Sequence, residues 1–428
     1  MTPAAENGHS GQLDSGTTQA SWPQEDLLRR LVSALNIAKR TMEILGRDGY
    51  REEVPSEDSF GPDKPLAETA MLLYVIDAMD GPPHRELRNH ELRLLLAALA
   101  RSPRTALAIA LHPTICFQLA MPHILLTRLG LEDPHFNRVL TLSAESPASR
   151  GREVLPHRAL ERCWLRSLWS TTPPGPEFDV AVANSVMSHP LDLLWGSRDD
   201  AYAYTHTFMY FTDFGRNLRP LPRARAELVA ESTGLLLRSL LMEDFDLAAE
   251  VLMTWPLMSA DWTPAATFGF RVLAELEDRA GYLPAGNGVP EKFHRLSGAE
   301  RTRYALAAAY HTAYVMGMLC ALAVGPGRSP PHAIAGPLAP ATLVETLLGV
   351  IPVADTPWQI TFRKLRLVEQ RALAPTLLHF ALLAKISRHD LSGTAELLEI
   401  AAQHDIADTP VCAQAAQLLQ RVATCAAR

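Results

Sequence analysis

The chain has 428 residues, 47% of them hydrophobic, so it can bury a large core. Its formal net charge is -7 at pH 7, and no stretch is dense in Lys or Arg. These properties argue against nucleic acid as the main partner and against recruitment to an anionic membrane surface.

The order of the chain predicts a short tail, an N-terminal helix with a linker, and one large helical domain. Residues 1–21 are rich in Gly, Ser and Thr and predict a disordered tail. Residues 22–65 predict an N-terminal amphipathic helix that stops near Gly46, followed by a polar linker. Residues 66–428 predict a single all-α domain, since apolar residues recur at helical spacing throughout. The expected helices lie at about 66–80, 84–101, 103–111, 114–130, 157–169, 198–213, 223–241, 244–254, 264–281, 298–324, 340–350, 359–387, 392–404 and 409–426.

The pattern predicts an all-α fold, because no alternating strand pattern stands between turn residues. Segment 304–324 has no charged residue and segment 198–213 has none between residues 201 and 212, a pattern typical of helices that line the inside of an α/α barrel or toroid. Segment 262–284 resembles one helical repeat of such toroids. An irregular helical bundle is the alternative. Segment 304–324 could also cross a bilayer by length, but Tyr304, Tyr310 and His311 favour a buried inner helix.

Segment 196–215 carries the most informative polar pattern. As a helix, it places Asp199, Tyr202, His206, Tyr210 and Asp213 on one stripe, because steps of three and four residues return to the same face. His206 and Asp213 lie about 10 Å apart along such a helix, so they cannot ligate one metal together. The stripe predicts a pocket wall, with His206 as base, Tyr210 beside it, and Asp199 and Tyr202 as substrate contacts. A core histidine bonded to a tyrosine is the plainer alternative.

Segment 304–320 offers a second histidine with tyrosines at helical spacing. Tyr304, His311 and Tyr314 share one face. We expect His311 to serve as acid opposite His206, with Tyr314 at the reaction centre, Tyr304 contacting substrate, and Asp213 or Asp199 fixing a histidine tautomer. A variant places a single metal ion between His206 and His311, although no motif with metal-ligand spacing occurs and the cofactor stays unknown.

Two further histidines are candidates for substrate contacts. His157 follows Pro156 at an expected helix start, and His189 precedes Pro190 ahead of the main stripe. Helix capping or first-turn stabilisation by Glu161 would explain them equally well.

Three sequence blocks resemble a functionally uncharacterised bacterial family of all-helical proteins. They are SHPLDLLWGSRDDAYAYTH (188–206), TDFG (212–215) and AYHTAYVMG (309–317). The resemblance covers about residues 65–325 and implies an all-helical protein encoded near natural-product genes. It implies no activity and no catalytic residues.

Together these patterns predict an enzyme of specialised metabolism that performs acid–base chemistry on a small, largely apolar substrate. Cyclisation, isomerisation and elimination all fit. The alternative is a non-catalytic helical scaffold or ligand-binding partner of a biosynthetic enzyme. The five cysteines are scattered and form no CxxC pair, and no basic start precedes an apolar run, so we expect free thiols and a cytoplasmic protein. A small molecule is the expected partner, without nucleic acid or membrane, and a homo-oligomer is compatible with the sequence.

Overall fold

The computed structural model describes residues 20–48, 63–79, 87, 89–285, 294–325 and 327–426. Residues 1–19 of the expected tail and most of the expected linker lie outside this part of the chain. Residues 20–22 pair with the backbone of residues 330–332, so the last residues of that expected tail are tied down.

The all-α prediction is confirmed, because the described residues form helices and no β-strand. The helices of the first half are α1 (Gln24–Asp48), α2 (Asp63–Asp77), α4 (His90–Ala100), α5 (Pro103–Leu111), α6 (Cys116–Leu119), α7 (Met121–Arg128), α8 (Pro134–Glu145), α9 (Pro156–Ser170), α10 (Pro176–Ala183) and α11 (Arg198–Phe211). Those of the second half are α12 (Arg225–Leu241), α13 (Phe245–Met258), α14 (Pro264–Ala280), α16 (Gly298–Ala323), α17 (Ala341–Val350), α18 (Pro357–Lys364), α19 (Leu367–Ala372), α20 (Ala374–Ile386), α21 (Leu391–Gln403) and α22 (Pro410–Ala426). Short 3₁₀ turns lie at Pro113–Ile115, Pro147–Arg150 and Val186–Ser188.

Proline explains several differences from the expected boundaries. The single helix expected over 359–387 is three helices, α18, α19 and α20, and Pro375 lies in the first turn of the last of them. Helices α8 and α10 were not predicted, and each begins with a proline in its first turn. Conversely, α13 continues to Met258 through Pro256, past the end predicted at residue 254.

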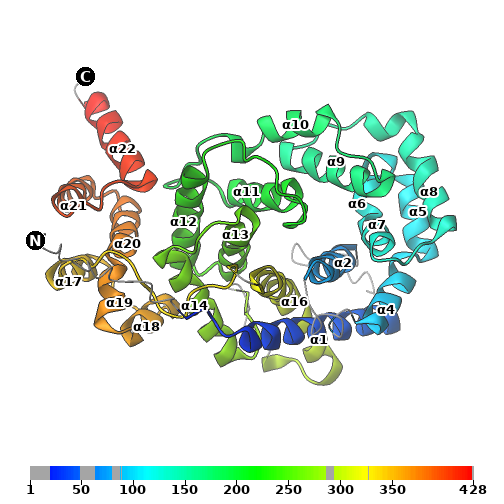
Figure 1. Cartoon of the computed structure of the whole chain (residues 1–428), viewed down its shortest axis with the longest axis horizontal. Helices are drawn as coiled ribbons and strands as arrows, with labels where there is room; N and C mark the ends of the chain where they lie inside the picture. The colour runs from blue at the N-terminus through cyan, green and yellow to red at the C-terminus, as the bar shows by residue number, and fades with distance from the viewer. Residues whose placement is uncertain are drawn as a thin grey trace, which may run out of the picture.

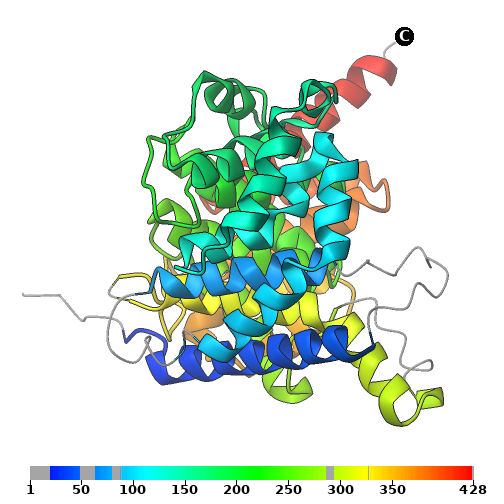
Figure 2. The ribbon, with the colours of Figure 1, turned by 90° about the vertical axis from the view of Figure 1, so that its right-hand side faces the viewer.

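Six helices are neighbours in a closed circuit at the centre of the fold. Helix α2 packs on α7, α7 on α9, α9 on α11, α11 on α13, α13 on α16, and α16 back on α2 (Figure 1). Helix α1 lies along α16, and α12 packs on α13. Figure 2 shows α1 running across the molecule beneath α2. The C-terminal helices α17–α22 stand to one side, where α20 and α22 contact α12.

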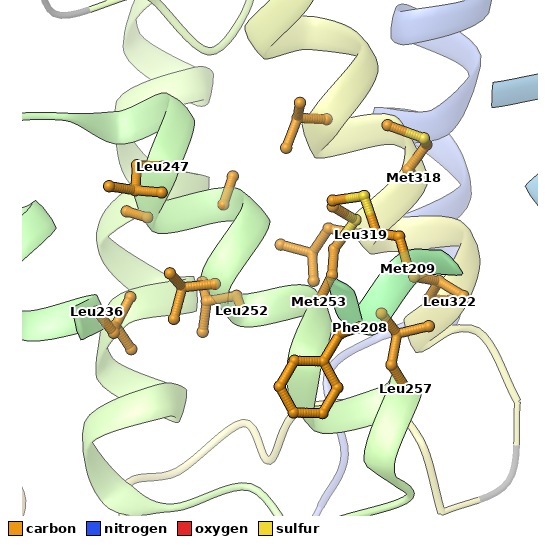
Figure 3. Packing of buried hydrophobic residues seen from close by; sticks show 14 of the residues in the cluster. Phe208, Met209, Leu236, Leu247, Leu252, Met253, Leu257, Met318, Leu319 and Leu322 are labelled. Carbon is orange, nitrogen blue, oxygen red and sulfur yellow. The ribbon is translucent and has the colours of Figure 1, made fainter. Parts of the chain in front are cut away.

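The apolar core is continuous across α11, α13 and α16. Phe208 and Met209 of α11 meet Met253 and Leu257 of α13 and Leu319 of α16 (Figure 3). Every residue of α13 is buried. Helix α16 is long and apolar enough to cross a membrane, and the bent pair α4 and α5 passes the same test jointly. However, 72% of the apolar window of α16 is buried inside the protein, as in any core helix.

The contact between α1 and α16 depends on Gly317. A Cβ atom added there would lie 2.6 Å from the Cβ of Ala34, which cannot rotate away. We therefore expect Gly317→Val to lower the free energy of unfolding by about 1–3 kcal/mol, the usual cost of overpacking. A Cβ atom added at Gly349 of α17 would lie in open space, so Gly349→Ala is the control without crowding. Urea unfolding of both variants measures the difference, and equal stability would contradict the close approach.

Candidate functional site

Helix α11 is held at both ends, and this fixes the direction of its polar stripe. Ser197 and Asp200 form a capping box at the start. After Phe211 the chain leaves the helix through Asp213, Phe214 and Gly215, all with positive φ. The predicted stripe then splits: Asp199 is exposed in the first turn, whereas Tyr202, His206 and Tyr210 face the interior.

Helix α13 contributes two carboxylates from a helix that is otherwise almost wholly apolar. Asp246 and Glu250 are 7% and 2% exposed and lie one turn apart on the same face. The hydroxyl of Tyr202 donates to Oδ2 of Asp246, and the hydroxyl of Thr205 donates to Oε2 of Glu250 at 2.6 Å. The other oxygen of Asp246, Oδ1, is buried and accepts no hydrogen bond from any residue that the structure describes.

Helix α16 brings His311 between carboxylates from two other helices. Its Nδ1 donates to Oε2 of Glu68 on α2 at 2.9 Å. Its Nε2 forms an ion pair with Oδ1 of Asp246 at 3.2 Å, and this contact does not have the geometry of a hydrogen bond. A carboxylate on each side holds this imidazole in one orientation.

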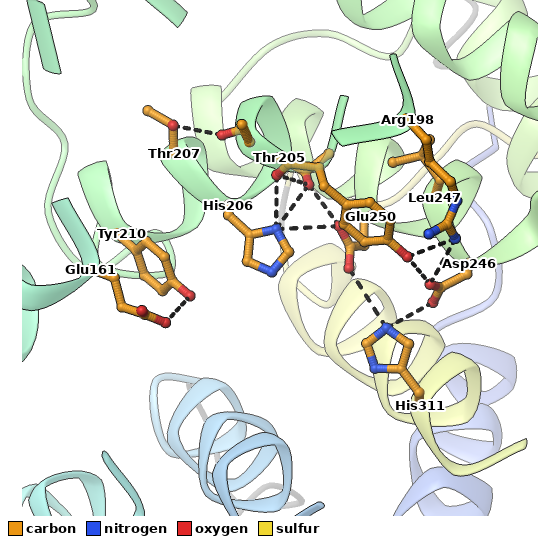
Figure 4. Close-up of polar contacts among 12 residues, drawn as sticks. Glu161, Arg198, Thr205, His206, Thr207, Tyr210, Asp246, Leu247, Glu250 and His311 are labelled. Carbon is orange, nitrogen blue, oxygen red and sulfur yellow. Dashed lines mark hydrogen bonds and ion pairs between the residues drawn. The ribbon is translucent and has the colours of Figure 1, made fainter. Parts of the chain in front are cut away.

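The two predicted histidines meet at Glu250. Nδ1 of His206 lies 3.7 Å from Oε2 of Glu250, and Nε2 of His311 lies 3.9 Å from Oε1 (Figure 4). His206 donates its Nδ1–H to the backbone carbonyl of Tyr202 at 2.8 Å, because a carbonyl can only accept. The neutral ring therefore keeps its lone pair on Nε2. This carbonyl fixes the tautomer of His206, a role that the sequence had suggested for Asp213 or Asp199.

We define the polar centre as Glu68, His206, Asp246, Glu250 and His311. A small cavity adjoins it. The cavity offers about 20 Å³ to the centre of a water-sized sphere, which is room for about one water molecule. Four of the five residues of the centre line it, all except Asp246. The rest of the lining is mostly apolar and methionine-rich: Met71, Met209, Tyr314, Val315 and Met318.

Burial and neighbouring charges move the protonation equilibria of the centre in opposite directions. Burial, with the charge of Asp246, raises the pKa of Glu250 to about 8. Burial works against the charged form of His311 as well, yet Glu68 and Asp246 hold its pKa well above the ordinary value. For Asp246, burial is outweighed by His311 and its pKa is lowered. Burial lowers the pKa of His206, so this ring is neutral near pH 7.

A second polar group lies on the far side of His206. Tyr210 donates to Oε1 of Glu161 on α9 at 2.8 Å, and Arg158 pairs with the same carboxylate at 3.2 Å. The ring of His157 lies 6.5 Å from that of His206, and burial lowers the pKa of His157 to about 4. The predicted residues Tyr210 and His157 are thus close to His206 but separate from the carboxylates of α13.

The remaining predicted residues lie elsewhere. Asp213 accepts hydrogen bonds from Trp164 at 2.7 Å and Tyr74 at 3.0 Å at the end of α11. Tyr314 lines the cavity and accepts from Thr69 at 3.2 Å. Tyr304 is half-buried in the first turns of α16. His189 is exposed beside the carbonyl of Ala183, so it does not reach the polar centre.

Sequence reasoning missed the carboxylates Glu68, Asp246 and Glu250, and it named Glu161 only as a first-turn partner of His157. A signal for two of them exists in segment 245–258, where Asp246 and Glu250 are the only charged residues, one turn apart on an apolar helix. Glu68 and Glu161 lack such a signal, because their helices also carry ordinary surface charges.

A family model described as "Domain of unknown function (DUF6895)" matches residues 38–321. The chain belongs to this family. No curated protein and no solved structure matches the chain. The DUF6895 match includes every residue of the polar centre and the six helices of the central circuit except the last two residues of α16, while α17–α22 lie beyond it.

Proposed function

We propose that this DUF6895 protein is an enzyme that performs acid–base chemistry on a small, largely apolar substrate. The observation that carries the proposal is the meeting of His206 and His311 at Glu250, on the wall of a cavity whose other side is apolar. Catalysis requires such convergence of ionisable groups beside a space for substrate. Cyclisation, isomerisation and elimination are the reaction types that fit.

The two histidines are suited to opposite roles. His206 has a free lone pair on Nε2 and serves as the base. His311 lies between Glu68 and Asp246, which keeps positive charge on the opposite wall, where it stabilises negative charge that develops on the substrate. Substrate enters by displacing the methionine side chains of the cavity, since these are flexible and unbranched.

The circuit of six helices supports an α/α toroid as the finer architecture. Five of the six, all except α7, contribute polar residues to the region around His206 and His311. A toroid places the inner faces of its helices around one funnel, which would explain this convergence. We also place the protein in bacterial natural-product metabolism and in a reducing cytoplasm. The second placement is supported by the five cysteines, which are all free thiols.

Mutual satisfaction of the polar groups favours the second candidate, a non-catalytic scaffold or ligand-binding partner. Tyr202 with Asp246 and Tyr210 with Glu161 are paired side chains of the kind that stabilise a core. Under this alternative the polar residues specify the packing of α9, α11 and α13, and no turnover occurs.

Incubating the purified protein with a metabolite extract of the organism that encodes it distinguishes the two candidates. We expect the wild-type protein to deplete at least one metabolite, with a product of equal mass for isomerisation or cyclisation, or of lower mass for elimination. His206→Ala should lose this conversion while keeping the helical circular dichroism and melting temperature of the wild type. His404→Ala, at an exposed position, is the matched control. Insoluble His206→Ala protein and no depletion by the wild type would favour the scaffold.

A further inference from the structure

We propose that the polar centre binds one divalent transition-metal ion through Oδ1 of Asp246, one oxygen of Glu250 and Nε2 of His311. This inference rests on the proposed function and concerns the same polar centre. It identifies the metal ion as the electrophile of the proposed reaction. It also replaces the ligand pair His206 and His311 that the sequence suggested. In the metal-bound protein, the ion takes the place of the proton on His311 Nε2.

The spacing of the three ligand atoms matches a metal site. One ligand atom from each residue lies within 4.8 Å of the other two. Ligands that bind at about 2.1 Å around a common ion lie about 3 to 3.5 Å from each other. Nε2 of His311 is 3.2 Å from Oδ1 of Asp246 and 3.9 Å from Oε1 of Glu250, so only a small rotation of Glu250 is needed.

The oxygen Oδ1 of Asp246, which lacks a hydrogen bond, is a second indication of a ligand. Asp246 is 7% exposed, and its Oδ1 accepts no hydrogen bond from the described residues although it lies 3.2 Å from Nε2 of His311. Buried polar atoms are nearly always hydrogen-bonded, and each exception calls for an explanation such as a missing ion. A cation between Asp246 and His311 supplies the absent partner and removes the need for a proton on Nε2.

Each ligand side chain is held by a second group on the atom that faces away from the ion. Glu68 accepts from Nδ1 of His311 at 2.9 Å, the carboxylate–histidine arrangement typical of metal sites. Tyr202 holds Oδ2 of Asp246, and Thr205 holds Oε2 of Glu250 at 2.6 Å. This support fixes the directions of the ligands and leaves Nε2, Oδ1 and Oε1 for the ion.

The neighbouring cavity leaves room for an open coordination position. It holds about one water and is lined by Glu250, His311 and His206, so a metal-bound water would lie near the proposed base. Mixed oxygen and nitrogen ligands favour Mn²⁺, Fe²⁺ or Zn²⁺ over Mg²⁺ and Ca²⁺, which prefer oxygen alone.

The test is metal binding by the full-length protein, measured apart from activity. Chelator-treated protein is titrated with Mn²⁺, Zn²⁺ and Co²⁺ by calorimetry, and the absorption spectrum of the Co²⁺ form is recorded. We expect one equivalent per chain. Asp246→Asn should weaken binding more than about 100-fold and abolish the Co²⁺ spectrum, whereas Glu68→Gln, which acts on His311, should weaken it about 10- to 100-fold. Glu277→Gln is the matched control, because it changes a buried carboxylate outside the centre whose partner Arg30 keeps Asp26 and Asp278.

Absence of stoichiometric binding by folded wild-type protein would overturn the metal site, as would equal affinity of Asp246→Asn. Circular dichroism and the melting temperature of the metal-free variants establish that they are folded. The outcome is independent of the proposed function. If the protein binds metal but converts no metabolite, the metal site is supported and the proposed enzymatic function is contradicted. If conversion persists in the presence of a chelator, the enzymatic function is supported and the role of the metal as electrophile is contradicted.

Discussion

Glu250→Gln is expected to stabilise the metal-free protein, by an amount that grows with pH. The pKa of Glu250 is about 8 in the fold, against an ordinary value of 4.5, because the side chain is buried beside Asp246. Between these two values the unfolded chain loses the proton and the folded chain keeps it, so wild-type stability falls as the pH rises from 4.5 to 8. The full difference is about 5 kcal/mol at 1.36 kcal/mol per pKa unit, and glutamine does not titrate.

Urea unfolding at pH 5, 6.5 and 8 in the presence of a chelator measures this difference. The Gln variant should match the wild type at pH 5 within about 1 kcal/mol and exceed it by several kcal/mol at pH 8. Glu396→Gln, on the exposed side of α21, should reproduce the wild-type profile. A Gln variant that is less stable at every pH would show that Glu250 is a structural partner of Thr205. A stabilising result would mark Glu250 as a residue kept for function at the expense of stability.

His379 is expected to make the C-terminal helices sensitive to acid. It is 7% exposed in α20, and its Nε2 has no hydrogen-bond partner within the described part of the chain. Burial lowers its pKa from 6.5 to about 3. Its contribution is therefore fully present above pH 6.5 and is lost as the pH falls toward 3, because the unfolded chain takes up the proton first.

The expected loss is about 2 kcal/mol between pH 6.5 and 5, at 1.36 kcal/mol per pKa unit. His379→Leu keeps an apolar side chain in place and should remove this slope, so that the variant gains on the wild type as the pH falls. Thermal unfolding at pH 7, 6 and 5 makes the comparison, with His404→Leu at an exposed position as control. Parallel curves for the His379 variant and the wild type would mean that the fold does not lower the pKa of His379.

Local patterns were sufficient to predict most of the helices, although not α8 and α10, because helical periodicity is a property of each segment by itself. Helix α11 begins at the predicted residue 198, and α16 begins at the predicted residue 298. The breaks within 359–387 were missed, since Pro375 inside an apolar run reads equally as a kink or as a helix start. The order of packing around the centre depends on contacts between distant segments, which periodicity does not encode.

The candidate centre was predictable only in part for the same reason. His206 and His311 stood out because polar rings are rare on uncharged helices. Asp246 and Glu250 left a weaker signal, an acidic pair on an apolar helix. Glu68 shares its helix with the charged residues Asp63, Lys64 and Asp77, so only the packing of α2 on α16 reveals its role.

The wide separation of the centre along the chain has a consequence for its assembly. Glu68 and His311 are 243 positions apart, and the other residues of the centre come from two helices between them. A nascent polypeptide therefore cannot form the centre until α16 has left the ribosome and docked. Any ion would be loaded after folding, in contrast to small zinc domains, in which the metal organises a short local segment. Maturation of this protein would then depend on which cation the cell supplies to a finished fold.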